Sequence, residues 1–230
     1  MGEQQFDRAE KMLGESLMEK LSQARVILFG VGGVGSWCAE SLIRTGLKHI
    51  TIVDDDSVCE SNINRQLMAT TKTVGFPKVD VLCERLREIS PEAEILPLCK
   101  RYTKDTASEF NLGDYDFVLD AIDSLEDKAE LILNATSTSA TFISAMGAAL
   151  KMDPTQIQVT EFWKAYGCPL ARALRNKFKR LEKYPSRKFK VVFSPEPPVF
   201  SSGKGSLCCE VSVFGQIMAS LVILSLRDCK

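Results

Sequence analysis

The chain has 230 residues, 45% of them hydrophobic, and a formal net charge of −1 at pH 7. This length fits one large domain, or a domain with an appended lobe, and is enough to bury a core without disulfide or metal staples. The eight cysteines form no C-x-x-C pair and residues 1–25 carry charges throughout. These features argue against a disulfide framework, and we expect a cytoplasmic chain with free thiols and no secretory leader.

Short hydrophobic segments of strand length alternate along the chain with segments in which hydrophobic residues repeat at the spacing of a helix. We expect helices at about residues 33–45, 77–89 and 125–139. We expect strands at Val26–Gly30, Ile50–Asp54, Ile95–Cys99, Phe117–Asp120 and Phe142–Met146. The alternation predicts an α/β fold with a doubly wound, Rossmann-like and mostly parallel sheet.

The first expected strand runs into the glycine-rich turn G-V-G-G-V-G, which contains Gly30, Gly32, Gly33 and Gly35. This spacing lets a backbone approach a phosphate at a helix N-terminus. The acidic residues 54–56 follow about twenty positions later and suit a ribose hydroxyl. The motif leaves NAD and ATP both open, and such a turn also occurs where it only packs a helix on a sheet.

Charged residues downstream of the turn favour ATP over NAD. Arg65 brings a planar fork to phosphate oxygens, and Lys78 brings a compact charge to an oxygen that becomes negative when ATP is cleaved between its α- and β-phosphates. Asp123 follows the fourth expected strand, where the carboxyl end of a parallel strand faces the ligand crevice. A carboxylate in that place can hold Mg²⁺.

The pattern changes after residue 150. We interpret residues 1–150 as the nucleotide-binding core and residues 151–230 as a smaller substrate-side lobe of one continuous domain. The lobe contains the short runs Ile157–Thr160 and Val191–Phe193, with a basic segment between them. Its apolar run Val211–Leu226 is short for a membrane span, so we expect a buried closing helix, although membrane contact stays open.

A basic segment lies inside this lobe. Ten Lys or Arg and a single acid, Glu182, lie between Lys164 and Lys190, so the segment carries +9 and the rest of the chain −10. Such a segment predicts a polyanionic partner, although a solvated helix face gives the same pattern.

The motifs GVGGVGSW, VDDDSV, SNINRQ, VGFPK and LDAIDS together resemble the E1-like adenylating superfamily, which activates ubiquitin and bacterial sulfur-carrier proteins. The resemblance implies that ATP is bound and that Asp123 coordinates Mg²⁺. It also implies a homodimer in which Arg8, from the motif Phe6-Asp-Arg8, completes the site of the neighbouring subunit. The residues that it assigns to ATP are Gly30, Gly32, Gly33, Gly35, Asp54, Asp56, Asn62, Arg65, Gln66, Lys78 and Asp123, and those that it assigns to catalysis are Arg8, Arg65, Lys78 and Asp123.

Within this superfamily the stretches at residues 144–159, 168–172 and 191–196 resemble the tRNA threonylcarbamoyladenosine dehydratases. These enzymes use ATP to close the threonylcarbamoyl group on adenosine 37 of tRNA into a ring. The basic segment would then hold the tRNA backbone. The candidate tRNA-binding residues are Arg172, Arg175, Lys179 and Arg180.

Several alternatives stay open at this stage. An adenylyltransferase for a ubiquitin-like sulfur carrier commonly carries two zinc-binding C-x-x-C pairs, which the sequence lacks. A nucleotide-binding module without catalysis would not need Arg65, Lys78 and Asp123 together. The sequence does not say whether a sulfur-relay protein is a partner, whether a monovalent cation is required, or whether Cys168, Cys208 and Cys209 have a role.

Overall fold

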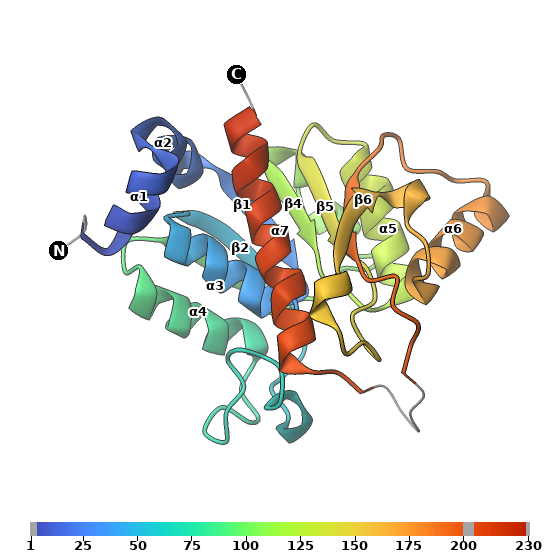
Figure 1. Ribbon diagram of the computed structural model, residues 1–230, viewed down its shortest axis with the longest axis horizontal. Coiled ribbons are helices and arrows are strands. Elements are labelled where there is room, and N and C mark those ends of the chain that lie inside the picture. The colour runs from blue at the N-terminus through green and yellow to red at the C-terminus, as the bar shows by residue number, and fades with distance from the viewer. Residues whose placement is uncertain (1–3, 200–204, 229–230) are drawn as a thin grey trace.

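The computed structural model describes residues 4–199 and 205–228, and its centre is a seven-stranded sheet of order β3-β2-β1-β4-β5-β7-β6 (Figure 1). Every neighbouring pair of strands is parallel except β6 and β7, which are antiparallel. The prediction of a doubly wound, mostly parallel α/β fold is therefore confirmed. The strands are β1 (Arg25–Phe29), β2 (His49–Val53), β3 (Glu94–Leu98), β4 (Phe117–Asp120), β5 (Thr141–Ala145), β6 (Gln158–Glu161) and β7 (Lys190–Phe193).

Helices cover both faces of the sheet. The helices are α1 (Asp7–Leu13), α2 (Glu15–Gln23), α3 (Gly35–Thr45), α4 (Lys78–Ile89), α5 (Leu125–Thr136), α6 (Pro169–Leu181) and α7 (Cys208–Asp228). Short 3₁₀ turns lie at η1 (Gln4–Phe6), η2 (Glu60–Asn62), η3 (Ala107–Glu109), η4 (Leu112–Asp114), η5 (Pro154–Gln156) and η6 (Phe162–Lys164). The three helices expected at 33–45, 77–89 and 125–139 correspond to α3, α4 and α5, with ends that differ by at most three residues.

Alternate side chains of the strands enter two separate cores. In β1, Leu28 joins the core beneath α3, α4 and α7, whereas Ile27 and Phe29 join the core beneath α5 and α6. This follows from the period of two along a strand, which sends successive side chains to opposite faces. Since both faces are buried, the strands read as continuous hydrophobic runs.

The strand order reverses between β1 and β4. From β1 the chain builds outward through β2 to β3, and it then returns to place β4 and β5 on the other side of β1. The loops that leave β1 and β4 consequently diverge to opposite faces, and a crevice opens outside their carboxyl ends. The glycine turn follows β1 and Asp123 follows β4, so the topology brings them together.

The second part of the chain extends the same sheet. β7 pairs with β5 in parallel, and β6 forms the sheet edge beside β7. The middle of the basic segment forms helix α6, which packs beside α5. Strands β7 and β6 thus extend the sheet beyond β5, and the division into a nucleotide-binding core at residues 1–150 and a substrate-side lobe at residues 151–230 stays a prediction.

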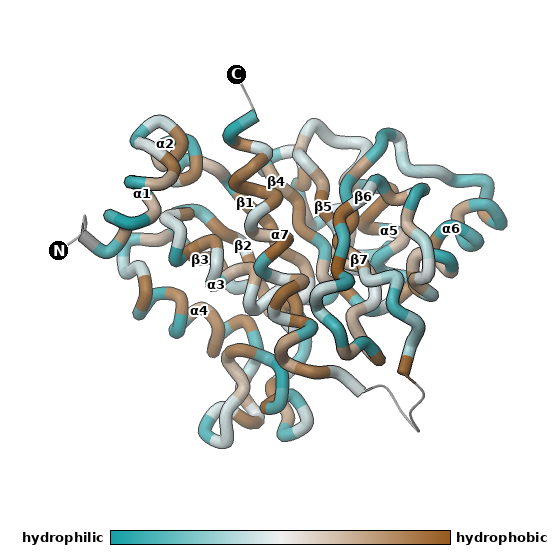
Figure 2. The backbone as a smooth tube through the Cα atoms, in the orientation of Figure 1, coloured by the Kyte–Doolittle hydropathy of each residue, from teal (hydrophilic) through white to brown (hydrophobic). Residues whose placement is uncertain are grey.

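α7 crosses one face of the sheet over α3 and is coloured mainly as hydrophobic (Figures 1 and 2). It is the one helix in the described part of the chain that is long and apolar enough to cross a membrane. Its residues Phe214, Met218 and Val222 are nevertheless buried in the core. At Gly215 an added Cβ would lie 2.4 Å from the carbonyl oxygen of Val34, so the two helices touch through backbone. We therefore interpret α7 as the buried closing helix.

Candidate nucleotide-binding site

The glycine turn after β1 packs closely against neighbouring backbone. Gly30 has φ +84°, and a Cβ there would lie 2.7 Å from the carbonyl oxygen of Ala121 in the loop after β4. Gly35 begins α3, and a Cβ on it would lie 1.8 Å from the carbonyl oxygen of Gly30. No side chain fits at either position, so the turn packs on the neighbouring loop and leaves the N-terminus of α3 open to the crevice.

A pocket of about 700 Å³ lies at the carboxyl ends of the central strands. The structure places Arg8 on α1 and outside the lining of its own chain's pocket, and Gly35 behind the turn. The other residues expected to bind ATP all line the pocket: Gly30, Gly32, Gly33, Asp54, Asp56, Asn62, Arg65, Gln66, Lys78 and Asp123.

Asp54 connects the glycine turn to the loop after β2. Its carboxylate accepts hydrogen bonds from the backbone N–H groups of Val31, at 2.8 Å, and Asp56, at 3.0 Å. Burial raises the pKa of Asp54 above the usual carboxyl range, an effect that Lys78 and the two backbone donors offset in part. The Asp54 carboxylate is thus fixed at the edge of the pocket where a ribose hydroxyl could donate to it.

Lys78 is the first residue of α4 and is only 5% exposed. Its Nζ lies 2.6 Å from the Asp56 carboxylate and 3.9 Å from that of Asp54. An ammonium group has three donors and Asp56 takes one of them, so a phosphate oxygen in the pocket could accept another. The two carboxylates compensate the buried charge of Lys78.

The segment around η2 supplies three more polar residues to the lining of the pocket. The Asn62 side chain accepts the backbone N–H of Cys59 at 3.2 Å, which closes the turn. Arg65 donates from Nη1 to the carbonyl of Ser61 at 2.6 Å and to the Asn64 side chain at 3.0 Å, so its guanidinium is oriented before any ligand binds. Gln66 is 7% exposed, and its Oε1 is buried without a hydrogen-bond partner among the described residues.

A fully buried ion pair supports the loop that carries Asp123. Nζ of Lys128 lies 2.8 Å from both carboxylate oxygens of Asp120 and 2.8 Å from the carbonyl of Ile122, and both charged side chains are 0% exposed. Asp120 also accepts the backbone N–H of Ile122 at 3.0 Å and the hydroxyl of Ser144 at 2.6 Å. These bonds fix the path of residues 120–123 and therefore the position of Asp123.

The sequence did not indicate some of the pocket residues. Lys100 and Arg101 follow β3 and line the pocket, and Arg101 donates from Nε and Nη2 to Asp127 at 2.9 and 2.8 Å. The same rule that selected Asp54 and Asp123, namely position after a parallel strand, would have found Lys100 and Arg101. Asp127 and the buried pair of Asp120 and Lys128 carry no such signal, since their roles depend on tertiary contacts.

The chemistry of the pocket fits a nucleotide with its metal. The glycine turn leaves space that a Cβ would fill, Oε1 of Gln66 lacks the donor that a nucleotide hydroxyl or amino group carries, and Arg65 and Lys78 supply positive charge for phosphates. Asp123 is exposed within the pocket and offers a hard oxygen ligand.

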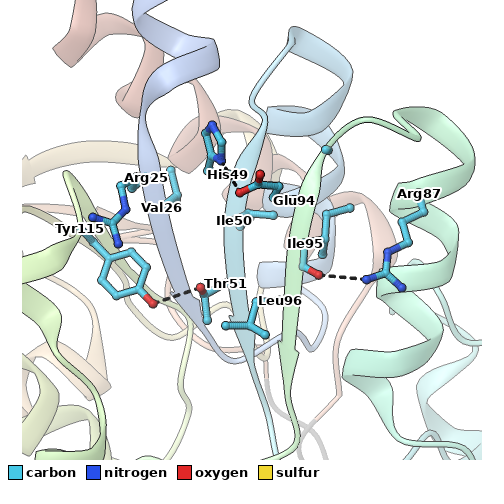
Figure 3. A pocket seen from close by; sticks show the side chains of 11 residues that line it. Arg25, Val26, His49, Ile50, Thr51, Arg87, Glu94, Ile95, Leu96 and Tyr115 are labelled. Atoms are coloured by element: carbon cyan, nitrogen blue, oxygen red, sulfur yellow. Dashed lines mark hydrogen bonds and ion pairs between the residues drawn. The ribbon is translucent and has the colours of Figure 1, made fainter.

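A second hollow, of about 430 Å³, lies at the opposite, amino-terminal ends of β1, β2 and β3 (Figure 3). Most of its polar side chains already bond to one another or to backbone, and the Arg25 guanidinium lies over the Tyr115 ring. The Tyr115 hydroxyl lies 3.1 Å from that of Thr51, His49 lies 3.0 Å from the Glu94 carboxylate, and Arg87 donates to the carbonyl of Ile95. We therefore place the chemistry of the protein in the larger pocket.

Comparisons with known proteins are consistent with a nucleotide-binding role for this pocket. A family model described as the ThiF family matches residues 6–226. The chain belongs to the ThiF family. Its ThiF-family relatives include the tRNA threonylcarbamoyladenosine dehydratase of Escherichia coli, which is 38% identical over 210 residues that cover 89% of this chain and 78% of the relative. The enzyme of the same name from Bacillus subtilis is 39% identical over 195 residues, which cover 85% and 76% of the two chains.

Solved structures of similar proteins show the same fold. The crystal structure of the E. coli dehydratase, TcdA, in complex with ATP has a TM-score of 0.91 and 34% sequence identity, with 97% of this chain and 94% of that chain covered. A complex of the same enzyme with AMP matches equally well. A more distant relative, the molybdopterin-synthase adenylyltransferase of Salmonella typhimurium, is 32% identical over 160 residues, which cover 70% of this chain and 62% of the relative.

Proposed function

We propose that the protein is an ATP-dependent, cytoplasmic tRNA threonylcarbamoyladenosine dehydratase. The observation that carries this proposal is the pocket itself, in which the glycine turn, Arg65, Lys78 and Asp123 meet at the reversal of strand order. The dehydratase relatives, at 38% and 39% identity over most of this chain, point to the substrate. The complexes of the E. coli enzyme with ATP and AMP support the nucleotide.

The reaction needs the pocket to activate a carboxylate, which by itself is a poor electrophile. An oxygen of the threonyl carboxylate attacks the α-phosphate of ATP, and pyrophosphate leaves. Arg65 and Lys78 stabilise the charge that develops on the phosphate oxygens during this transfer. The carbamoyl group of the same molecule then attacks the activated carbonyl, loses a proton and expels AMP. Because that nucleophile is already attached, its effective concentration is high and no enzyme nucleophile is needed.

Mg²⁺ is the metal that Asp123 would hold, and there it would neutralise charge on the phosphates. The cluster of Asp54, Asp55 and Asp56 also brings three carboxylates within 4.8 Å of one another. Lys78 already pairs with Asp56 and lies near Asp54, so we assign this cluster to the ribose and to the lysine.

The experiment that tests the function is a direct assay. The protein is incubated with ATP, Mg²⁺ and tRNA bearing threonylcarbamoyladenosine, and the nucleoside is examined by mass spectrometry. Loss of one water, with release of AMP, is the expected result. AMP formation only when a ubiquitin-like sulfur carrier replaces the tRNA would favour the adenylyltransferase alternative. If the protein binds ATP but turns over neither substrate, the remaining interpretation is a nucleotide-binding module without catalysis.

We further propose a homodimer with composite sites. Arg8 is exposed on α1 and does not line the pocket of its own chain, so it is free to serve a neighbouring subunit. Mixing an Arg8→Ala protein with an Asp123→Ala protein is expected to restore activity, because each heterodimer contains one pocket with both residues intact. Activity is measured after subunit exchange has been confirmed by mass spectrometry. No recovery in exchanged mixtures would contradict donation of Arg8 in trans.

The tRNA backbone is proposed to lie along α6. Arg172, Lys179 and Arg180 are exposed on this helix. Arg175 differs from them, because its Nη1 donates to the carbonyls of Phe162 and Ala165 at 3.2 and 2.7 Å. Variants that test RNA binding should therefore leave Arg175 intact.

A sulfur-relay protein stays a proposed partner. Of the described cysteines in the second part of the chain, Cys168 is 1% exposed, whereas Cys208 and Cys209 are exposed at the start of α7. Cys208 and Cys209 are therefore accessible to a partner protein, and they are where a sulfur-relay contact should be sought.

A further inference from the structure

Two aromatic side chains form an exposed pair near the C-terminal end of α6. Trp163, in η6, is 38% exposed, and Tyr184, three residues beyond the end of α6, is 54% exposed. Their ring centroids lie 6.2 Å apart with 44° between the ring planes. Indole and phenol rings at a surface present flat apolar faces together with a polar group, which a ligand with a ring system can use.

Buried neighbours hold Trp163 in place. Trp163 packs edge-on against Phe162, with centroids 5.2 Å apart, and Phe162 is fully buried and stacks on Phe189 at 5.0 Å. The guanidinium of Arg175 fastens η6 to α6 through the carbonyls of Phe162 and Ala165. A flat side chain that is fixed before binding loses little conformational entropy on binding.

The segment that carries the pair is strongly basic, although it is not free of acids: the Glu161 carboxylate accepts the backbone N–H of Trp163, and the exposed Glu182 lies two residues before Tyr184. The exposed cations along α6 and the turns at its two ends are Lys164, Arg172, Lys179, Arg180, Lys183 and Lys188. Aromatic rings set among positive charges are the combination with which proteins bind unpaired nucleotides, because the rings stack on bases while the cations neutralise phosphates. Charge complementarity thus favours RNA as the occupant of this surface.

Helix α6 connects the pocket to the aromatic pair. Pro169 and Leu170 line the pocket at the first turn of α6, and from Leu170 the helix runs roughly 16 Å to Leu181. Figure 1 shows α6 at the side of the sheet away from α1 and α2. A nucleic acid strand with one nucleoside in the pocket can therefore follow α6 to the aromatic pair.

We propose that Trp163 and Tyr184 form a stacking platform for unpaired bases of the tRNA that flank the nucleoside in the pocket. This inference rests on the proposed function, since it takes tRNA as the substrate. An enzyme that acts on a nucleoside within RNA takes one that is already unpaired or draws it out of its stack, and drawing it out leaves neighbouring bases without stacking partners. The two rings can replace the lost stacking.

The test compares two double variants for affinity to tRNA in the absence of ATP. Trp163→Ala/Tyr184→Ala removes the platform without a change of charge, so we expect affinity to fall by about tenfold or more, with an unchanged slope of log affinity against log salt. Lys179→Gln/Arg180→Gln removes two cations, so we expect a slope that is smaller by about one to two units. Tyr184→Ala alone, at a residue outside any helix or strand, serves as the variant that keeps the fold.

A spectroscopic readout separates stacking from a general loss of binding. Binding of tRNA should quench the tryptophan fluorescence of the unaltered protein, and Trp163→Phe should remove most of that quenching while retaining much of the affinity. Equal tRNA affinities for the unaltered protein and the platform variant would overturn the proposal. The proposal would also be overturned if the platform variant changed from dimer to monomer while its tRNA affinity stayed the same. The pair would then be a contact between two copies of the chain. If the dehydration assay fails but the protein binds tRNA and the platform variant does not, the proposed function is rejected and the stacking platform is retained.

Discussion

Replacement of Lys78 by alanine is expected to abolish formation of the acyl-adenylate, with a rate at least about 100-fold lower. Nζ of Lys78 lies in the pocket beside Asp54 and Asp56, and it is nearly buried, so solvent screens its charge poorly. A charge in that place acts on the phosphate oxygens during transfer more than on bound ATP. We therefore expect kcat to fall more than the affinity for ATP. The measurement is the initial rate of AMP release with modified tRNA.

Lys100 provides a matched control for this prediction. It also lines the pocket and carries the same charge, but it is half exposed and pairs with Glu109 at 2.6 Å. Lys100→Ala should change the rate by only a few fold, because an exposed and screened charge contributes little. Binding of tRNA should be unchanged in both variants, since α6 is untouched. Equal rate losses in the two variants would show that the pocket needs positive charge in general and not Lys78 in particular.

The sheet was predictable because its strands and helices carry local signals. β1, β2, β4 and β5 are short apolar runs with polar or glycine-rich ends, and α3, α4 and α5 have helical period. The antiparallel edge strand β6 was expected only as an isolated run, because its pairing with β7 is a long-range contact that no local pattern encodes. The fold of the basic segment into α6 was left open, since its many charges obscure the buried stripe of Ala171, Leu174 and Phe178.

The site was predictable where its residues follow the ends of parallel strands. The topology brings all such loops to one edge of the sheet, which is why Gly30, Asp54 and Asp123 line one pocket. What the sequence could not give is the support under that edge. Asp120 and Lys128 are ordinary charged residues in the sequence, and only the packing of α5 on β4 shows that they are buried together. The role of Arg8 in a neighbouring subunit stays a prediction.

Lys128→Met is expected to destabilise the protein by about 3–5 kcal/mol, the cost of leaving a buried carboxylate without its partner. Asp120 would keep the Ser144 hydroxyl and the Ile122 N–H as hydrogen-bond donors but lose its only cation among the described residues. The free energy of unfolding from urea titration measures this loss. Arg101→Met is the matched control, because it breaks an ion pair with Asp127 in which the Arg101 side chain is 57% exposed. Since water screens that pair, its loss should change the free energy of unfolding far less.

The double variant Lys128→Met/Asp120→Asn separates the stability of this pair from its role in the site. The amide introduced by Asp120→Asn carries no charge and can still accept the N–H of Ile122, so most of the lost stability should return. The carbonyl of Ile122 would still lack the donor that Lys128 supplies at 2.8 Å, and the loop that carries Asp123 would be less firmly held. We therefore expect the double variant to fold but to need more Mg²⁺ for half-maximal AMP release. A double variant that regains both stability and the normal Mg²⁺ requirement would show that the buried pair serves the fold alone, and that Asp123 is positioned by the backbone of β4 and α5 without it.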